Sequence, residues 1–256
     1  MELTGFDRNC IALVDDAPNQ RSRHCFRSAL KHLELAEALV AVDPAMAIFR
    51  GITAEEEAAS GLMFCLQELG YQNSEKLNPR NHVHKSAMIP FFRVLGSFFE
   101  ETIGANGLKP ALHIKIDNGM RRLTVAIPMQ VNGSAINAYP IPPLNFSVKS
   151  EGRSPSYRRQ IERHAQSEGF TNMTSYVKRE ANLRNELLYA SPAGYPTVNE
   201  VKPKFLAIKQ SHVLALMRAY LFVFPYPDHQ PFVQDALDAF LVMLGRLDDH
   251  NLHAEV

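Results

Sequence analysis

Hydrophobic residues recur at helical spacing over long stretches of the chain. Between Arg23 and Val42 the apolar positions lie three or four residues apart, and the same spacing continues from Ala45 to Leu69. This pattern is typical of amphipathic helices that bury one face. The pair Asp43-Pro44 separates the two stretches, and Gly70 offers a stop for the second. We therefore expect two long antiparallel helices in the first third of the chain.

Five further stretches repeat the helical spacing. One runs from about Asn81 to Ile103, and Pro90 within it indicates either a kink or a late first turn. The other four follow Gly152, and their expected bounds are Tyr157 to Gly169, Met173 to Tyr189, Lys204 to Phe224 and Pro231 to Leu247.

The spacing of apolar residues changes to two between Lys109 and Lys149. In the first part of this segment the apolar residues alternate with polar ones, at Leu112, Ile114 and Ile116. Asn118-Gly119 is typical of a type I′ hairpin turn, and the stretch from Val131 to Ser134 predicts a second turn. The prolines between Ala138 and Leu144 belong at a sheet edge or in a loop. We expect an antiparallel sheet of three or four strands, because a single hairpin would be marginally stable.

These elements predict a mainly α fold, a helical bundle with a small inserted antiparallel β-sheet. Its parts would be an N-terminal helical part (1–105), a β-hairpin insert (106–150) and a C-terminal helical part (151–256). The two helical parts would form one composite domain. The 256 residues are 46% hydrophobic, which is enough for a substantial core.

Charge and cysteine content narrow the possible classes of function. The 27 Lys and Arg residues balance the 27 Asp and Glu residues, so any contact with nucleic acid must be local. Cys10, Cys25 and Cys65 lack a CxxC pattern and predict free thiols, rather than disulfides or a zinc site. We find no signal peptide and no apolar run of about 20 residues. A cytoplasmic protein without membrane contact, metal or cofactor is expected.

The chain contains one stretch with a recognisable motif, Leu183 to Ser191. In it Arg184 and Asn185 precede an apolar run that contains Tyr189. The stretch resembles the active-site signature of HEPN-type helical proteins, in which an Arg and a polar residue are followed at a fixed distance by His. An acidic, alanine-rich segment from Phe49 to Ala59 is similar to the second helix of HEPN-like and abortive-infection families. The resemblance implies a homodimeric helical bundle that binds or cleaves RNA, in a defence or toxin setting.

The resemblance also implies roles for individual residues. In HEPN ribonucleases the Arg and the His assist attack of a ribose 2′-hydroxyl on the adjacent phosphate, without a metal. Arg184 would then contact phosphate, Asn185 would orient it, and Tyr189 would stand where the His belongs. A phenol is a poor base near neutral pH, so binding without cleavage and a purely structural arginine are alternatives. The apolar neighbours of Tyr189 predict that its ring packs in the bundle.

A second candidate is the polar segment that starts at Arg80. If the helix already includes Arg80, then Arg80 and His84 share a face, and His84 supplies the imidazole that the first motif lacks. His82 and His84 would lie on opposite faces, which argues against a two-histidine metal site. The alternative is a polar helix start capped by Asn81 or by the preceding Asn78.

The acidic residues Glu55 and Glu56 are candidates to orient an arginine. Either could form an ion pair with Arg184 or Arg80 across the bundle. The alternative is that these residues, with Glu57, form a solvated face.

Basic residues of the C-terminal half are candidates to bind RNA. They are interleaved with tyrosines that could stack on bases, and they comprise Lys149, Arg153, Arg158, Arg159, Arg163, Lys178, Arg179 and Arg184. Arg80, in the N-terminal half, is a further candidate to bind RNA. The alternative is an ordinary helix surface, on which nearby glutamates balance the positive charges.

Two functions therefore remain, a metal-independent ribonuclease or RNA-binding protein, and a noncatalytic helical module that binds a partner protein or a nucleotide. The apolar content of the last two helices also predicts a homodimer.

Overall fold

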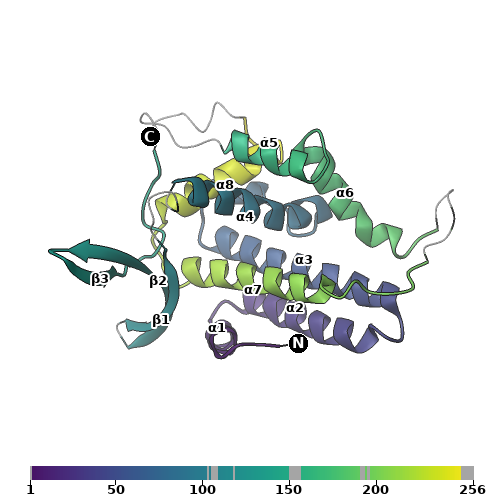
Figure 1. Ribbon diagram of the computed structural model, residues 1–256, viewed down its shortest axis with the longest axis horizontal. Coiled ribbons are helices and arrows are strands. Elements are labelled where there is room, and N and C mark those ends of the chain that lie inside the picture. Colours follow the sequence, from purple (N-terminus) through teal and green to yellow (C-terminus); the bar gives the residue numbers. More distant parts are fainter. Residues whose placement is uncertain are drawn as a thin grey trace. The chain divides into compact units, whose positions relative to one another are not determined.

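A computed structural model describes residues 2–102, 104, 109–117, 119–149, 157–190, 194 and 197–248. Over these residues the fold is mainly α with a small antiparallel sheet inserted between helices, which confirms the predicted fold class (Figure 1). The helices are α1 (Gly5–Asp15), α2 (Gln20–Leu39), α3 (Pro44–Glu68), α4 (His82–Thr102), α5 (Arg158–Ser167), α6 (Met173–Glu186), α7 (Phe205–Val223) and α8 (Pro231–Met243), with a 3₁₀ turn at Ser74–Lys76.

Helix α1 was not among the predicted elements, although its start carries a capping signal. The hydroxyl of Thr4 accepts a hydrogen bond from the backbone N–H of Asp7, whose carboxylate accepts one from the N–H of Thr4. This reciprocal pair is a capping box, which satisfies two otherwise unpaired donors.

Pro90 lies in the interior of α4, so the expectation that it belongs to a late first turn of this helix is wrong.

The sheet has the strand order β1 (Ala111–Asp117), β2 (Met120–Val131) and β3 (Ser134–Ala138). Both strand pairs are antiparallel, and Val131 pairs with Ser134 across the second turn. Asn132 and Gly133 in that turn have φ values of 50° and 78°, as a type I′ turn requires. Of the first predicted turn, Asn118 lies outside the described residues. No fourth strand is present between residues 109 and 149 as far as they are described.

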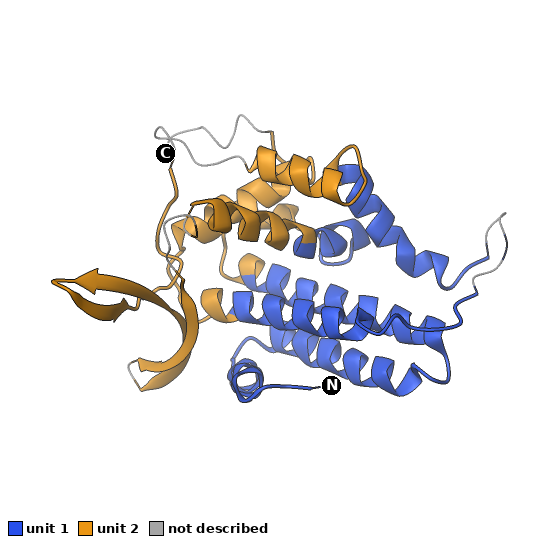
Figure 2. Cartoon of the chain, in the orientation of Figure 1, with its two compact units in different colours: residues 1–65, 78–89, 174–220 blue, residues 66–77, 90–173, 221–256 orange. Residues whose placement is uncertain are grey.

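The chain folds into two compact units (Figure 2). Unit 1 comprises residues 1–65, 78–89 and 174–220, and unit 2 comprises residues 66–77, 90–173 and 221–256. Each unit therefore combines segments from before and after the sheet in the sequence. The described part of the chain contains no helix with the length and apolar character needed to cross a membrane.

The core of unit 1 depends on close approach of α3 to α2 and α7. A Cβ at Gly61 would lie 3.0 Å from the ring of Phe26 on α2, and a Cβ at Gly51 would lie 2.8 Å from the ring of Phe205 on α7. Phe26 also contacts Tyr220 of α7, with ring centroids 5.1 Å apart. The two glycines thus allow the three helices to bury their apolar faces together.

Unit 2 has an aromatic core of its own. The ring of Phe91 in α4 contacts Tyr157 and Phe240, with centroids 6.3 and 5.4 Å away. Gln230 is buried before α8, where its side chain accepts a hydrogen bond from the N–H of Leu144 and donates one to the carbonyl of Phe222. The segment after β3 is therefore held by a buried amide instead of by strand pairing.

Candidate functional site

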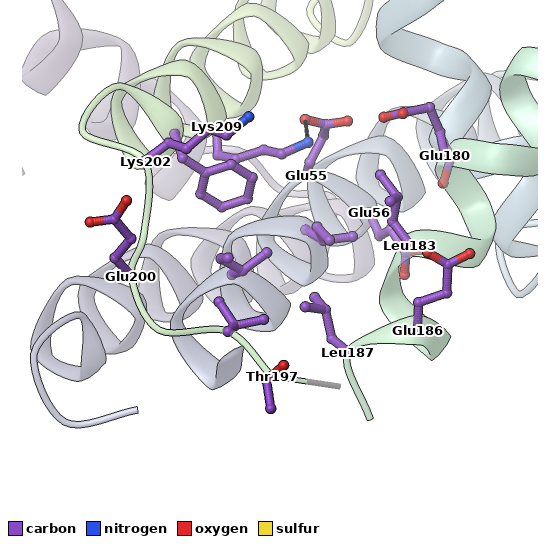
Figure 3. A pocket seen from close by; sticks show the side chains of 15 residues that line it. Glu55, Glu56, Glu180, Leu183, Glu186, Leu187, Thr197, Glu200, Lys202 and Lys209 are labelled. Atoms are coloured by element: carbon purple, nitrogen blue, oxygen red, sulfur yellow. Dashed lines mark hydrogen bonds and ion pairs between the residues drawn. The ribbon is translucent and has the colours of Figure 1, made fainter. Parts of the chain in front are cut away.

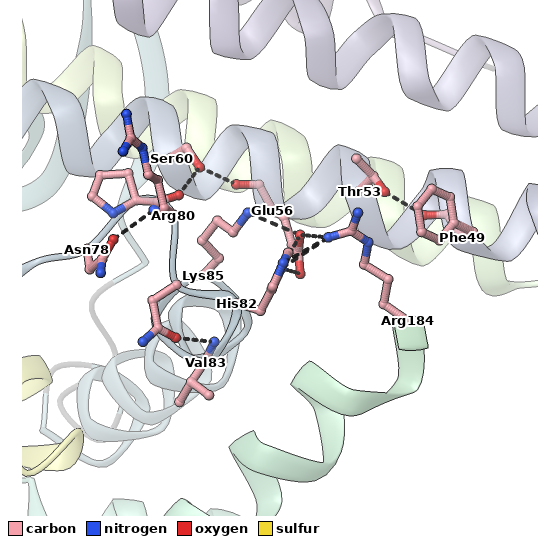
Figure 4. A network of polar contacts seen from close by, with 12 residues as sticks. Phe49, Thr53, Glu56, Ser60, Asn78, Arg80, His82, Val83, Lys85 and Arg184 are labelled. Carbon is pink, nitrogen blue, oxygen red and sulfur yellow. Dashed lines mark hydrogen bonds and ion pairs between the residues drawn. The ribbon is translucent and has the colours of Figure 1, made fainter. Parts of the chain in front are cut away.

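A cluster of charged side chains in unit 1 joins three helices (Figure 4). It consists of Glu56 from α3, His82 and Lys85 from the first turn of α4, and Arg184 from the last turn of α6. We refer to these four residues as the Glu56 cluster. All of its members belong to unit 1, although they lie up to 128 positions apart in the sequence.

Local structure at the start of α4 places two members of the cluster. The side chain of Asn81 accepts a hydrogen bond of 2.8 Å from the N–H of Val83 and so caps the helix, as predicted. With the helix starting at His82, the side chains of His82 and Lys85 are separated by three residues and share one face. The hydroxyl of Ser60 on α3 donates to the carbonyl of Pro79, which ties the segment before α4 to α3.

Glu56 is the centre of the cluster and is only 3% exposed. Its carboxylate oxygens both lie 2.9 Å from Nδ1 of His82, and one of them lies 3.2 Å from Nζ of Lys85. The same oxygen lies 3.6 Å from Nη1 of Arg184. A buried carboxylate is costly unless it is paired and hydrogen-bonded, and here three partners supply that compensation.

The guanidinium of Arg184 lies against the imidazole of His82. Nη1 is 3.2 Å from Nδ1 and 3.0 Å from Nε2 of the ring. A nitrogen that is nearly equidistant from both ring nitrogens cannot lie along the lone pair of either one, so it lies over the ring face. The guanidinium also lies 4.8 Å from the ring centroid of Phe49, and its buried Nε has no hydrogen-bond partner among the described residues.

This geometry prepares His82 for proton transfer. Because Glu56 accepts the hydrogen bond from Nδ1–H, the lone pair of the neutral ring lies on Nε2. The side chain of His82 is 42% exposed, so a ligand can reach it. A base oriented by a buried carboxylate, with a guanidinium over it, can remove a proton from a hydroxyl and bind an anion next to it.

The structure brings together only part of the predicted site. The ion pair predicted for Arg184 forms with Glu56. The imidazole next to Arg184 belongs to His82, whereas the sequence predicted His84. His84 is 2% exposed and accepts a hydrogen bond on Nδ1 from the backbone N–H of Asn78. Arg80 precedes the helix, so the helical face that it was expected to share with His84 does not exist.

Glu55 makes a separate set of contacts with α7. Its carboxylate lies 2.9 Å from Nζ of Lys209 and 2.6 Å from Nδ1 of His212. Burial raises the pKa of Glu55, but the charge of Lys209 and the hydrogen bonds from both partners outweigh burial and lower the pKa to about 2. Glu55 therefore holds α3 to α7 and does not contact Arg184.

Tyr189 does not pack in the bundle, and that expectation is wrong. Helix α6 ends at Glu186, three residues earlier than predicted, and the side chain of Tyr189 is 65% exposed. The apolar neighbours of Tyr189 in sequence do not form a helical face, because the helix has already ended. The side chain of Asn185 is exposed and forms no hydrogen bond with Arg184 in the described structure.

Tyr189→His is expected to leave both stability and any RNA cleavage nearly unchanged. The exposed ring contributes little packing, so the free energy of unfolding should change by less than about 0.5 kcal/mol. The new imidazole would lie beyond the end of α6, whereas His82 already occupies the position beside Arg184. Urea unfolding and a cleavage assay on this variant check both expectations. A loss above about 1 kcal/mol, or a gain of cleavage, would contradict the placement of Tyr189.

The predicted RNA-binding residues are divided between the two units. Arg158, Arg159 and Arg163 belong to α5 in unit 2, where Arg163 forms an ion pair with Glu101. Lys178 and Arg179 are exposed on α6 in unit 1, and Arg179 forms an ion pair with Glu186. The exposed side chain of Arg80 has no ion-pair partner in the part of the chain described.

Sequence reasoning missed His82 and Lys85 as members of the site. A signal for them exists, because a capping asparagine fixes the helix start and the His-x-x-Lys spacing then places both side chains on one face.

Among the described residues, no group of three or more His, Cys, Asp or Glu side chains is arranged to hold a metal ion. Comparisons with protein-family models, curated proteins and solved structures found no match for this chain.

Proposed function

We propose that the Glu56 cluster binds RNA and cleaves it without a metal, as the resemblance of the Arg184 motif to HEPN-type proteins implies. The observation that carries the proposal is the position of His82 between a buried carboxylate and the guanidinium of Arg184. This arrangement supplies the imidazole that is missing at position 189. A homodimer and a role in defence remain predictions from the same resemblance.

The proposed reaction uses the 2′-hydroxyl of the RNA as the nucleophile. Nε2 of His82 takes the hydroxyl proton while the 2′-oxygen attacks the adjacent phosphorus. Arg184 stabilises the charge that develops on the phosphate oxygens, and Glu56 stabilises the imidazolium. The bond to the 5′-oxygen breaks, this oxygen takes a proton from solvent, and the products are a 2′,3′-cyclic phosphate and a 5′-hydroxyl.

A second Arg–His pair near Arg184 supports RNA over a smaller anion. Nη1 of Arg50 on α3 lies 3.3 Å from Nδ1 of His32 on α2. Burial lowers the pKa of His32, and the positive charges of Arg50 and Arg184 lower it further, while Glu57 opposes them. Arg50 also follows Phe49, whose ring the guanidinium of Arg184 contacts, and two cations in this part of unit 1 suit the successive phosphates of a polynucleotide.

Cleavage assays on histidine and arginine variants test the proposal. The wild-type protein should cleave mixed RNAs in EDTA, and His82→Gln or Arg184→Ala should slow cleavage by about 100-fold or more, because each removes a group that acts in the transition state. His113→Gln, which alters an exposed histidine of the sheet, is the matched control and should retain full activity. Absence of cleavage, or equal cleavage by all variants, would refute a ribonuclease.

The noncatalytic module is the second candidate. It is favoured by Leu188 and Tyr189, two exposed apolar or aromatic side chains that follow α6 close to Arg184 in sequence. Such side chains are common at protein interfaces. A stable complex with a partner protein, isolated from native lysate without nuclease activity, would support this candidate in place of the enzyme.

A further inference from the structure

A pocket of about 530 Å³ in unit 1 adjoins the Glu56 cluster (Figure 3). Glu56 itself lines this pocket, and a second lining carboxylate, that of Glu55, pairs with Lys209. A third, that of Glu186, forms an ion pair with Arg179. Because these charges are balanced within the chain, the pocket belongs to the site already described and does not indicate a ligand of its own.

The hairpin of β2 and β3 in unit 2 has a surface of a different kind. Residues 126–148, which include the end of β2 and all of β3, contain no Asp, Glu, Lys, Arg or His, whereas Asp, Glu, Lys and Arg make up 21% of the whole chain. The side chains of Met129, Val131 and Ile136 are between 43% and 46% exposed. Met129 lies opposite Ile136, and Val131 lies two positions further along β2, so the three share one face of the hairpin.

Strand β3 lies at the edge of the sheet, because the strand order is β1-β2-β3 (Figure 1). An edge strand presents unpaired backbone N–H and C=O groups to other chains, and proteins usually block such edges with lysines, prolines or bulges. The sequence of β3 is Ser-Ala-Ile-Asn-Ala, and it pairs with β2 residue for residue, without a bulge. Its residues are exposed from Ser134 to Asn137. The edge is therefore open to pairing with another strand.

The register of the hairpin shows which backbone groups of β3 are free. Val131 and Ser134 flank the two-residue turn and form a hydrogen-bonded pair. Hydrogen-bonded and non-hydrogen-bonded pairs alternate along an antiparallel ladder, so the pair of Pro128 and Asn137 is non-hydrogen-bonded. This agrees with the missing N–H of proline. The N–H and C=O groups of Ala135 and Asn137 therefore point away from β2, towards the open edge.

We propose that β3 pairs with β3 of a second copy of this chain, antiparallel and centred on Ile136. In this register Ala135 lies opposite Asn137 of the partner subunit, and the two-fold axis repeats the pair. Both residues point outward, so each pair exchanges both of its backbone hydrogen bonds. Ile136 lies opposite its own copy in a non-hydrogen-bonded pair, where facing side chains are closest and bury apolar surface.

Charge and register both favour a second copy as the occupant of this edge. A charged patch repels an identical patch, and residues 126–148 carry no charge that would oppose self-association. Shifting the register by two residues would move one pair onto Gly133 in the turn or onto Tyr139 beyond the strand, so the centred register forms the most hydrogen bonds. The proposal is independent of RNA cleavage, and its interface is the sheet, whereas the sequence predicted a dimer through the last two helices.

Light scattering on the full-length protein tests the pairing of β3. The wild type should have twice the chain mass of 28.8 kDa at about 100 μM. Asn137→Pro removes an outward N–H on an edge strand, where proline is tolerated, and so removes one hydrogen bond from each pair. It should raise the dissociation constant at least tenfold. Asn137→Ala keeps the N–H and is the matched control, with the affinity of the wild type. A monomeric wild type, or an unchanged dissociation constant for Asn137→Pro, would overturn the proposal.

Cysteine cross-linking locates the two-fold axis without weakening the backbone pairing. Ile136→Cys places two thiols opposite each other in a non-hydrogen-bonded pair, at a spacing that suits a disulfide. Mild oxidation should convert most of this variant to a covalent dimer on a non-reducing gel. Ala135→Cys is the matched control, because its thiol lies too far from its own copy in the centred register. It should cross-link no more than the wild type, which contains Cys10, Cys25 and Cys65. Equal cross-linking by the two variants, or none by Ile136→Cys, would overturn the proposal.

Discussion

Replacing Glu56 with Gln is expected to lower the free energy of unfolding by about 3–5 kcal/mol, which is the usual cost of leaving a buried charge without its partner. Lys85 is the residue that would lose most. Its side chain is only 9% exposed, and its ammonium group has no ion-pair partner other than Glu56 among the described residues. Arg184 would lose its contact with the carboxylate in the same change. Urea unfolding followed by circular dichroism measures the effect.

Two controls separate the buried charge from other consequences of the Glu56 substitution. Glu57→Gln changes the next residue of α3, whose partly exposed carboxylate forms no ion pair within the described structure, and should cost less than about 1 kcal/mol. Glu56→Gln combined with Lys85→Met removes both buried charges and should recover more than half of the lost stability. Equal losses for Glu56→Gln and Glu57→Gln would show that the cluster does not stabilise unit 1.

Acidification is expected to remove about 3 kcal/mol of stability that arises from Glu55. The pKa of this carboxyl is about 2 in the folded protein, against an ordinary value of 4.5. A lowered pKa means that the folded state binds the proton less readily than the unfolded state. The contribution is therefore complete above pH 4.5 and is lost as the pH falls towards 2. The difference between the two pKa values, at about 1.36 kcal/mol for each pH unit, gives the magnitude.

The control for the Glu55 effect is a variant that cannot titrate at this position. Glu55→Gln should be less stable at pH 6, because Lys209 loses its buried partner. Its stability should also fall less between pH 6 and pH 3, by about 2 kcal/mol compared with the wild type. Denaturant titrations at these two pH values are sufficient. If the wild type and Glu55→Gln lost the same amount of stability between pH 6 and pH 3, other carboxyl groups would be the cause of the acid sensitivity.

The candidate site shows how far local sequence reasoning extends. The motif around Arg184 and the acidic residues of α3 were both selected, and the pairing of Glu56 with Arg184 was among the predicted arrangements. The choice between His82 and His84 failed because it depends on which face of α4 packs against α3 and α6. His82 lies on the face that contacts Glu56 and Arg184, whereas the imidazole of His84 is buried and accepts a hydrogen bond from the backbone N–H of Asn78.

The two adjacent glutamates of α3 illustrate what the tertiary structure adds. Each accepts contacts from a histidine and a lysine three residues apart on another helix, Glu56 from His82 and Lys85, and Glu55 from Lys209 and His212. The three-residue spacing of each histidine–lysine pair is visible in the sequence. The glutamate that each pair contacts is not visible there, because consecutive residues of a helix point about 100° apart and so Glu55 and Glu56 face different helices.

The sequence by itself determined the helical and strand-forming segments and the second hairpin turn, because hydrophobic spacing and turn residues act over a few neighbouring positions. It also contained the capping box of α1 and the asparagine cap of α4, which are local signals of the same kind. Only the tertiary structure decided which carboxylate meets which cation, and that Tyr189 is exposed while His84 is buried. These outcomes depend on where the helices end and on how helices that are far apart in the sequence pack together. A pattern of a few neighbouring residues carries no information about either.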